Sequence, residues 1–323
     1  MRAWIMNDPK TMELRDVPES ELPEGDVLID VHYSTLNYKD ALALTGRGKI
    51  VRSFPMVPGI DLSGVVAESS DASVAVGTPV VVNGHGMGED HWGGYAERAR
   101  VPGAWAQPIP EVFSVEDAMA IGTAGYTAAL CVLAVEEGGA EPGQEEVLVT
   151  GATGGVGSVA VSLLARRGHK VLAVTGRPQH ADALKALGAA EVVDRAELSG
   201  EKIRPLGKQR WHAAIDVAGS TTLAHVLSMT KYGGVVAATG LADGMDMKGW
   251  VTPFILRNVR LQGVDSVMTP RARRDQAWSL LAESLDKTQL TSIREVVGLE
   301  DVREKAADLL DGKVRGRLVV KVR

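Results

Sequence analysis

The segment from residue 147 to residue 157 holds the residues whose types and spacing best suit a chemical role. A short β-branched run, Val-Leu-Val-Thr, is followed by the glycine-rich turn Gly-Ala-Thr-Gly-Gly-Val-Gly. Gly154 would let the backbone approach a pyrophosphate, and Gly157 would let the next helix pack on the strand. The start of that helix would offer amide groups and a positive dipole end. This pattern predicts a dinucleotide site made by Gly154, Gly155, Val156 and Gly157.

The end of the next predicted strand indicates which dinucleotide binds. NAD sites usually place Asp or Glu about twenty residues after the turn, on the ribose 2′-hydroxyl. Here the strand ends Val-Thr-Gly-Arg-Pro, without a carboxylate. Thr175 can hydrogen-bond a 2′-phosphate and Arg177 can neutralise it, with Gly176 between them and Arg195 as a second candidate. The alternative for Arg177 is a solvated loop cation. We therefore predict NADPH as the cofactor.

Strands and helices must position these residues, and the sequence changes character near Gly122. Short strands separated by Gly and Pro come before it, and strands alternating with helices follow it, which indicates a parallel sheet with right-handed crossovers. The last strand would most simply pair with the N-terminal strands. The predicted strands are 27–32, 64–67, 79–82, 146–150, 170–175, 190–193, 213–217, 235–238, 258–264 and 318–322, and the predicted helices are 159–167, 181–187, 271–285 and 299–310.

Composition limits the possible functions. At about 150 residues per domain, 323 residues predict two domains. The formal net charge is −6 and there is no basic block, which argues against nucleic acid as a partner. One cysteine, Cys131, excludes an internal disulfide and a multi-cysteine metal site. We find neither a signal peptide nor a stretch that approaches the ~18 uninterrupted apolar residues of a spanning helix, so we expect a cytoplasmic protein without a membrane partner.

Over nearly its full length the chain resembles the medium-chain dehydrogenase/reductase superfamily. The resemblance implies an α/β fold: a GroES-like β domain, residues 1–121 and 256–323, with a doubly wound Rossmann NADP-binding domain, residues 122–255. Zinc alcohol dehydrogenases of that superfamily have a catalytic Cys and a later Gly-His-Glu motif. The matching stretches here, Leu-Asn-Tyr-Lys-Asp at 36–40 and Pro-Gly-Ile-Asp-Leu-Ser-Gly at 58–64, contain neither thiol nor imidazole. The resemblance therefore implies an enzyme without a metal.

Four segments are similar to the acryloyl-CoA reductase subfamily, whose members have also been labelled putative quinone oxidoreductases. They are 36–42, 58–61, 91–94 and, most specifically, 254–266, Phe-Ile-Leu-Arg-Asn-Val-Arg-Leu-Gln-Gly-Val-Asp-Ser. This similarity implies an NADPH-dependent oxidoreductase that converts acryloyl-CoA to propanoyl-CoA by hydride transfer to the β-carbon. Two alternatives remain open: an NADPH:quinone oxidoreductase, and a catalytically weak NADPH-binding protein like the lens crystallins.

The resemblance also implies site residues. Hydride transfer to an enoyl thioester builds negative charge on the thioester oxygen, and Asn37 and Tyr38 are candidate donors to it. Tyr38 or water would protonate the α-carbon. The alternative for Tyr38 is a packed residue bonded to a backbone carbonyl. The segment 45–49, where mitochondrial enoyl-thioester reductases place their tyrosine, has none. Residues implied to contact the cofactor outside the glycine-rich turn are Tyr38, Thr127, Leu241, Ile255, Ser266 and Arg317.

Further expectations concern partners. Coenzyme A is anionic, so two groups of cations could meet its phosphates, although such groups are usually solvated. His85 and His91 lie near glycines and are interpreted as structural, because no cysteine or acidic cluster surrounds them. The predicted strand 258–264 would leave an apolar sheet edge, which predicts a homodimer. The two groups of cations are Arg47, Lys49 and Arg52, and Arg271, Arg273 and Arg274.

Overall fold

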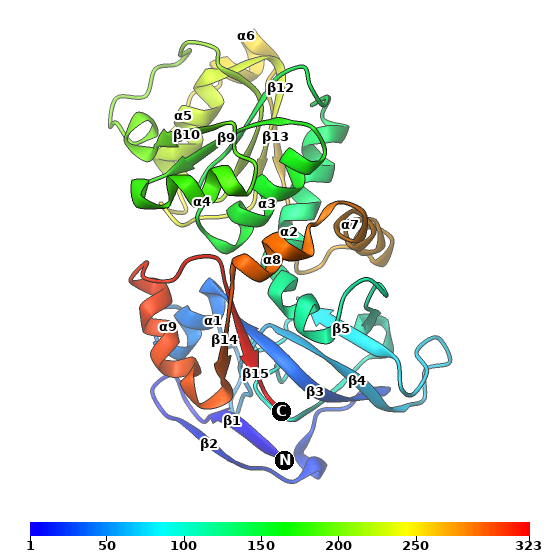
Figure 1. The fold of residues 1–323 in the computed structure, drawn as a ribbon. Helices are drawn as coiled ribbons and strands as arrows, with labels where there is room; N and C mark the ends of the chain where they lie inside the picture. The colour runs from blue at the N-terminus through cyan, green and yellow to red at the C-terminus, as the bar shows by residue number, and fades with distance from the viewer. The chain divides into compact units, whose positions relative to one another are not determined.

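A computed structural model describes residues 1–323 as two compact units (Figure 1). Unit 1 comprises Met1–Thr123, Ser266–Arg271 and Leu290–Arg323, and unit 2 comprises Ala124–Asp265 and Ala272–Gln289. Each unit is built from more than one stretch of the chain. The helices are α1 (Tyr38–Leu44), α2 (Val115–Glu137), α3 (Gly155–Arg166), α4 (Ala181–Ala186), α5 (Ser220–Met229), α6 (Thr252–Arg257), α7 (Arg271–Ser284), α8 (Lys287–Ser292) and α9 (Val302–Leu310).

Unit 1 contains a seven-stranded sheet. Six of its strands follow the order β14-β15-β3-β4-β5-β7, and the seventh, β6, pairs with β3. A separate hairpin, β1 with β2, completes its strands. The apolar side chains of these strands form one buried core that includes Ile29, Leu62 and Val320. The strands are β1 (Arg2–Met6), β2 (Met12–Asp16), β3 (Val27–Leu36), β4 (Asp61–Ser69), β5 (Pro79–Asn83), β6 (Arg98–Val101), β7 (Gln107–Pro108), β14 (Arg294–Gly298) and β15 (Arg317–Lys321).

The closing strand β15 lies inside this sheet. It pairs antiparallel with β3, with Leu318 opposite Leu36, and parallel with β14, with Arg317 opposite Arg294. The expectation that the last strand returns to the N-terminal β unit is confirmed. This pairing places Arg317 close to the end of β3, where α1 begins.

Unit 2 contains a six-stranded, fully parallel sheet with the order β10-β9-β8-β11-β12-β13. Numbered along the chain, this is the 3-2-1-4-5-6 order of a Rossmann fold, so the α/β class is confirmed. Helix α3 packs against β8 and β9, and α5 packs against β11 and β12. The strands are β8 (Glu146–Val149), β9 (Lys170–Thr175), β10 (Glu191–Asp194), β11 (Trp211–Asp216), β12 (Thr230–Ala238) and β13 (Arg260–Gly263).

The division of the chain differs from the expected one after residue 255. Residues 256–265 belong to unit 2 because β13 pairs in parallel with β12. Most of α7 also belongs to unit 2, where Arg273 forms an ion pair with Glu137. Sequence periodicity identifies a helix but not the unit against which it packs, so the compact units differ from the expected domains in this part of the chain.

Helix α2 is long and apolar enough to span a membrane by length and composition, but most of it is buried in this structure. The helix is broken at Gly122, whose φ of 50° and ψ of −164° are not helical. Positive φ at this value favours glycine, because any Cβ would be strained. The break separates a first part of α2 in unit 1 from a second part that begins at Thr123.

Candidate active site

The glycine-rich turn after β8 leaves the start of α3 without a side-chain cap. Gly154 is the N-cap residue, with φ −85° and ψ 177°, and no side chain accepts a hydrogen bond from the first turn. A Cβ on Gly157 would meet the Gly151 carbonyl oxygen and would lie 2.7 Å from Cα of Ala152, both of which are backbone atoms. Glycine is therefore required there for helix and turn to pack closely, and the free amides suit an anion.

The residues predicted to select NADPH lie together at the ends of β9 and β10. Nε and Nη2 of Arg177 donate to Oγ1 of Thr153 at 3.1 and 2.7 Å. The Arg177 backbone N–H donates to Oγ1 of Thr175 at 3.0 Å. A Cβ on Gly176 would come within 2.9 Å of the Arg195 guanidinium, so this group lies against the Gly176 backbone.

The parallel pairing of the two strands explains this convergence. Thr175 lies opposite Asp194 in the β9–β10 register, so both strands end at the same level and Arg195 follows directly. Partial burial lowers the pKa of Arg177. The two guanidinium groups and the Thr175 hydroxyl form a small cationic site suited to a phosphate monoester.

The other residues predicted to contact the cofactor are distributed over both units. In unit 2, Thr127 is buried in α2, whereas Leu241 is 53% exposed and Ile255 is 70% exposed. Ser266 and Arg317 belong to unit 1. The structure therefore brings together the predicted residues of the glycine-rich turn and those of the β9 and β10 ends, and the contacts of the remaining residues with a cofactor stay predictions.

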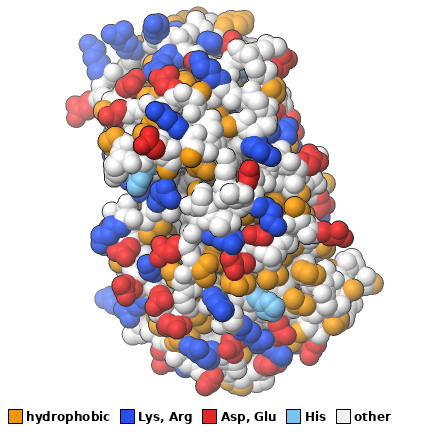
Figure 2. Space-filling view, in the orientation of Figure 1, with side chains coloured by type: hydrophobic (Ala, Val, Ile, Leu, Met, Phe, Trp, Pro, Cys, Tyr) orange, Lys and Arg blue, Asp and Glu red, His pale blue; other side chains and the backbone are white.

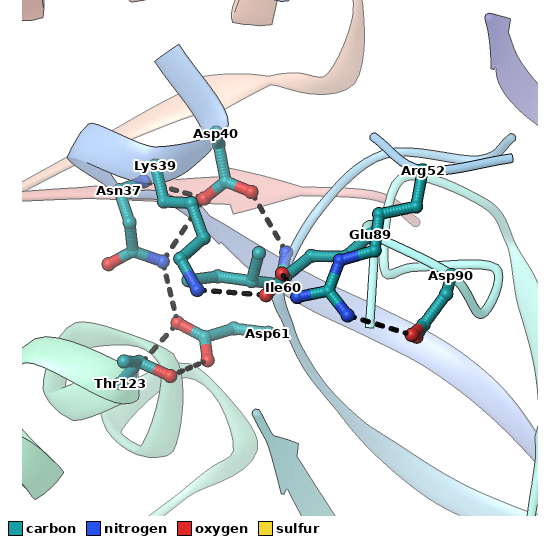
Figure 3. A network of polar contacts seen from close by, with 9 residues as sticks. All are labelled: Asn37, Lys39, Asp40, Arg52, Ile60, Asp61, Glu89, Asp90 and Thr123. Carbon is teal, nitrogen blue, oxygen red and sulfur yellow. Dashed lines mark hydrogen bonds and ion pairs between the residues drawn. The ribbon is translucent and has the colours of Figure 1, made fainter. Parts of the chain in front are cut away.

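In unit 1, a buried polar network surrounds the start of α1 (Figure 3). Asn37 is the N-cap residue of α1 and forms a capping box with Asp40. The Asn37 backbone N–H donates to Oδ2 of Asp40 at 2.8 Å, and the Ile60 N–H donates to Oδ1 at 2.9 Å. Complete burial raises the pKa of Asp40 to about 7, although the donated hydrogen bonds of Asn37 and Ile60 oppose this shift.

Asp61, the first residue of β4, is the centre of this network. Its carboxylate is fully buried and accepts hydrogen bonds from the backbone N–H and hydroxyl of Thr123, at the start of the second part of α2. Three further side chains donate to it at 2.6 to 2.8 Å: Thr35, Asn37 and Asn83. One carboxylate thus joins the ends of β3 and β5 and the starts of α1 and the second part of α2.

Arg317 balances these carboxylates and is only 3% exposed. Its Nε donates to the Ala120 carbonyl at 3.0 Å, and its Nη1 donates to Oδ1 of Asn37 at 3.1 Å. Its Nη2 is buried without a hydrogen-bond partner, and a Cβ on Gly122 would lie 2.5 Å from that nitrogen. Burial lowers the pKa of Arg317, while the nearby Asp61 and Asp40 carboxylates act in the opposite direction.

The two residues predicted to be catalytic differ in their surroundings. Tyr38 is the first residue of α1 and is 50% exposed, and its hydroxyl forms no hydrogen bond within the chain. The packed alternative for Tyr38 is therefore not what the structure shows. Asn37 is buried, its Nδ2 faces Thr35, Asp40 and Asp61, and its Oδ1 accepts from Arg317. Asn37 could reach a substrate oxygen only by releasing one of these partners.

The candidate cations for coenzyme A are mostly committed to ion pairs. Arg47 pairs with Asp311, and Arg52 pairs with Glu89 and Asp90; Glu89 also binds Lys39 (Figure 3). Over most of the face in Figure 2, Lys and Arg lie next to Asp and Glu. In the second group, Arg273 pairs with Glu137, and the buried Arg274 lies over the ring of Tyr126. Of the first group, Lys49 is exposed and has no ion pair.

The two histidines interpreted as structural flank one tryptophan. The ring of His85 stacks on Trp105 at 5.0 Å between centroids, and His91 meets the same ring edge-on. Nδ1 of His91 lies 3.0 Å from the Trp92 carbonyl oxygen. No group of three or more His, Cys, Asp or Glu side chains is arranged to hold a metal ion.

The sequence interpretation missed most of the buried network. From the sequence, Asp40 and Asp61 were considered only because their segments lack zinc ligands. Thr153 was considered only as part of the glycine-rich turn. An Asp directly before the apolar run Leu-Ser-Gly-Val-Val was the available signal for Asp61, because a buried carboxylate needs several donors. The network's other missed members are Thr35, Asn83 and Thr123.

Two domain families match the chain. Residues 23–111 match the alcohol dehydrogenase GroES-like domain, and residues 155–283 match the zinc-binding dehydrogenase family. The first match lies in unit 1, and the second covers much of unit 2.

Full-length relatives narrow this assignment. Probable acrylyl-CoA reductase AcuI of Escherichia coli (strain K12) is 51% identical over 325 residues, 100% of each chain. Acrylyl-CoA reductase AcuI of Ruegeria pomeroyi is 48% identical over 94% of this chain and 92% of its own. The crystal structure of the yhdH oxidoreductase from Salmonella enterica in complex with NADP is 49% identical, covers 100% of both chains and has a TM-score of 0.97. The chain belongs to the acrylyl-CoA reductase family of medium-chain dehydrogenases/reductases.

Proposed function

We propose that the protein is an NADPH-dependent reductase that converts acryloyl-CoA to propanoyl-CoA. The observation that carries this proposal is the full-length identity of 51% with a probable acrylyl-CoA reductase. A relative of nearly the same structure was solved with NADP, which supports the same cofactor here. The chemistry is reduction of an α,β-unsaturated thioester.

The residues of unit 2 fit NADPH. The pyrophosphate would lie at the uncapped start of α3. Gly157 has no side chain there, so the backbone of the turn can lie close to the helix. Thr175, Arg177 and Arg195 would hold the 2′-phosphate. When bound, NADPH supplies the hydride for the β-carbon of the substrate.

The residues of unit 1 supply the remaining requirements of the reaction. Negative charge develops on the thioester oxygen, and a fixed donor stabilises it. We assign the donor role to Tyr38, whose exposed hydroxyl has no partner within the chain. Tyr38 or water then protonates the α-carbon. Lys49 is the cation best suited to a phosphate of coenzyme A, because it has no acidic partner.

Steady-state kinetics with NADPH and three acceptors test this function. We expect kcat/KM to be highest for acryloyl-CoA, lower for crotonyl-CoA and lowest for a benzoquinone. Preference for the quinone would establish the NADPH:quinone oxidoreductase instead. NADPH binding without turnover of any acceptor would favour the crystallin-like alternative.

We also propose a cytoplasmic homodimer that works without a metal. Strand β13 lies at the edge of the unit 2 sheet and all four of its residues are exposed, so a second copy could cover this edge. Light scattering at micromolar concentration should give twice the 34.2 kDa chain mass. A monomer would contradict the dimer. The single cysteine, Cys131, forms no disulfide within the chain, which is usual in a reducing compartment.

A further inference from the structure

A chain of buried contacts connects the last strand of unit 1 to the first turn of α1. It runs from the Ala120 carbonyl to the Arg317 guanidinium, then to Oδ1 of Asn37. Asn37 caps α1, and Tyr38 is the next residue. The side chain of Arg317 therefore contacts the residue that sets the start of the helix bearing Tyr38.

The two ends of the Asn37 carboxamide are held by opposite charges. Nδ2 donates to the Asp61 carboxylate at 2.8 Å, and Oδ1 accepts from the Arg317 guanidinium at 3.1 Å. A flipped amide would place its NH2 group against a guanidinium and its oxygen against a carboxylate. Only one orientation of this side chain is compatible with both neighbours.

We propose that Arg317 and Asp61 are positioning residues for the reaction, acting through Asn37 on Tyr38. This inference rests on the proposed function and deepens it. Because Arg317 is held by the Ala120 carbonyl and by its own strand β15, it fixes Asn37 to the sheet. The exposed Tyr38 hydroxyl is then presented from a helix start that cannot tilt or fray freely, which reduces the reorganisation needed in the transition state.

The neighbouring strand provides a matched control. Arg294 lies opposite Arg317 in the β14–β15 register and also begins its strand. It forms ion pairs with Glu116 and Asp117, on the first part of α2, and has no contact with α1 in this structure. Loss of either arginine removes a cation bonded to α2, but only loss of Arg317 removes the hydrogen bond to Oδ1 of Asn37.

The experiment compares Arg317→Met, Arg317→Lys and Arg294→Met with the wild type. We expect Arg317→Met to lower kcat for acryloyl-CoA at least about tenfold. Because the guanidinium is buried and bonded to Ala120 and Asn37, KM for NADPH should change less than about twofold, and a larger rise in this KM would instead support the predicted contact of Arg317 with the cofactor. Arg317→Lys keeps the charge but not the planar fork, so its kcat should fall between the two. Arg294→Met should keep kcat within about twofold.

Hydrogen exchange of the peptide spanning residues 37–44 gives a readout that does not need activity. We expect faster exchange of this peptide in Arg317→Met and wild-type exchange in Arg294→Met. Equal behaviour of the two Met variants in kcat and exchange would overturn the proposal. If Arg317→Met does not fold, wild-type kcat and exchange in Arg317→Lys would overturn it. If the wild-type protein does not turn over acryloyl-CoA but the expected exchange difference is found, the proposed function is refuted and the link between Arg317 and α1 stands.

Discussion

The starts of α3 in unit 2 and α1 in unit 1 are built in opposite ways. Helix α3 begins at a glycine, and no side chain satisfies its first amides. Helix α1 begins at Asn37, which forms a capping box with Asp40 and is held further by Asp61 and Arg317. The start of α3 leaves its donors for a ligand, whereas the start of α1 is capped by side chains of the protein. The uncapped start of α3 therefore suits a ligand, and the capped, buried start of α1 suits a structural role.

Substitution of Gly157, at the start of α3, should have the largest effect of the predicted changes, and this effect should be on NADPH affinity. In Gly157→Val the added side chain would meet the backbone of Gly151 and Ala152. We expect a cost of about 3 kcal/mol at the turn, which corresponds to roughly hundredfold weaker NADPH binding. Fluorescence titration with NADPH measures this affinity. Gly249→Ala, whose Cβ would have no neighbour closer than 3.8 Å, serves as the control. Unchanged affinity in Gly157→Val would rule out the turn as the dinucleotide site.

Removal of Arg177 should separate the two dinucleotides. Arg177→Ala loses one charge-assisted phosphate contact, worth about 1.5–3 kcal/mol, so KM for NADPH should rise about ten- to a hundredfold. KM for NADH should change little, because NADH has no 2′-phosphate. Arg166→Ala, an exposed arginine of the same unit paired with Asp286, is the control. Equal effects on both cofactors would refute the 2′-phosphate assignment.

Substitutions of Tyr38 and Asn37 test whether kcat can be lowered without a loss of stability. Tyr38→Phe should stay folded, keep its NADPH affinity and lose at least about tenfold in kcat for acryloyl-CoA. Tyr232→Phe, also exposed but in unit 2, should behave as wild type. Asn37→Ala should lower kcat similarly and also lower the melting temperature, because it removes one hydrogen-bond partner from each of the buried Asp61 and Arg317. Wild-type kcat in Tyr38→Phe would assign the proton to water.

The buried carboxyl of Asp40 should make stability depend on pH. Its pKa in the folded protein is about 7, above the 3.8 of a free Asp, so the folded state retains a proton that the unfolded chain releases. Stability from this group is complete below about pH 4 and is lost as pH rises to about 7, with a slope of at most about 1.4 kcal/mol per pH unit. Urea unfolding across this range measures the slope.

Asp40→Asn should flatten this dependence, and the exposed Asp182→Asn should keep the wild-type slope. The charged groups that face Asp40 are Asp61 and Arg317. A slope in Asp40→Asn equal to that of the wild type would show that another group is responsible.

Chelation should have the smallest effect. The stretches that match zinc-ligand positions contain Asn37, Asp40 and Asp61, whose oxygens accept hydrogen bonds from the protein itself. We expect activity to survive prolonged chelation and elemental analysis to find no stoichiometric zinc. Stoichiometric zinc with chelator-sensitive activity would contradict this expectation.

The parts of the fold with local signals could be predicted from the sequence. The glycine-rich turn and the strand–helix alternation predicted the Rossmann sheet, and parallel strands necessarily bring Thr175 and Arg195 to one edge. The Asn37–Arg317 contact joins residues 280 positions apart, and no local pattern reports such a pairing. The unit to which α7 belongs was missed for the same reason, because packing between distant segments decides it.

The position of β15 has a consequence for synthesis of the protein on the ribosome. All six strands of unit 2 have been made once Gly263 is in the chain, but unit 1 then still lacks β14 and β15. Until the last residues emerge, the part of β3 from Tyr33 to Leu36 has no partner on the side that β15 later occupies. The unpaired backbone groups of such a strand edge can pair with other chains. A nascent or truncated chain ending before Arg317 should therefore depend on chaperones far more than the complete chain does.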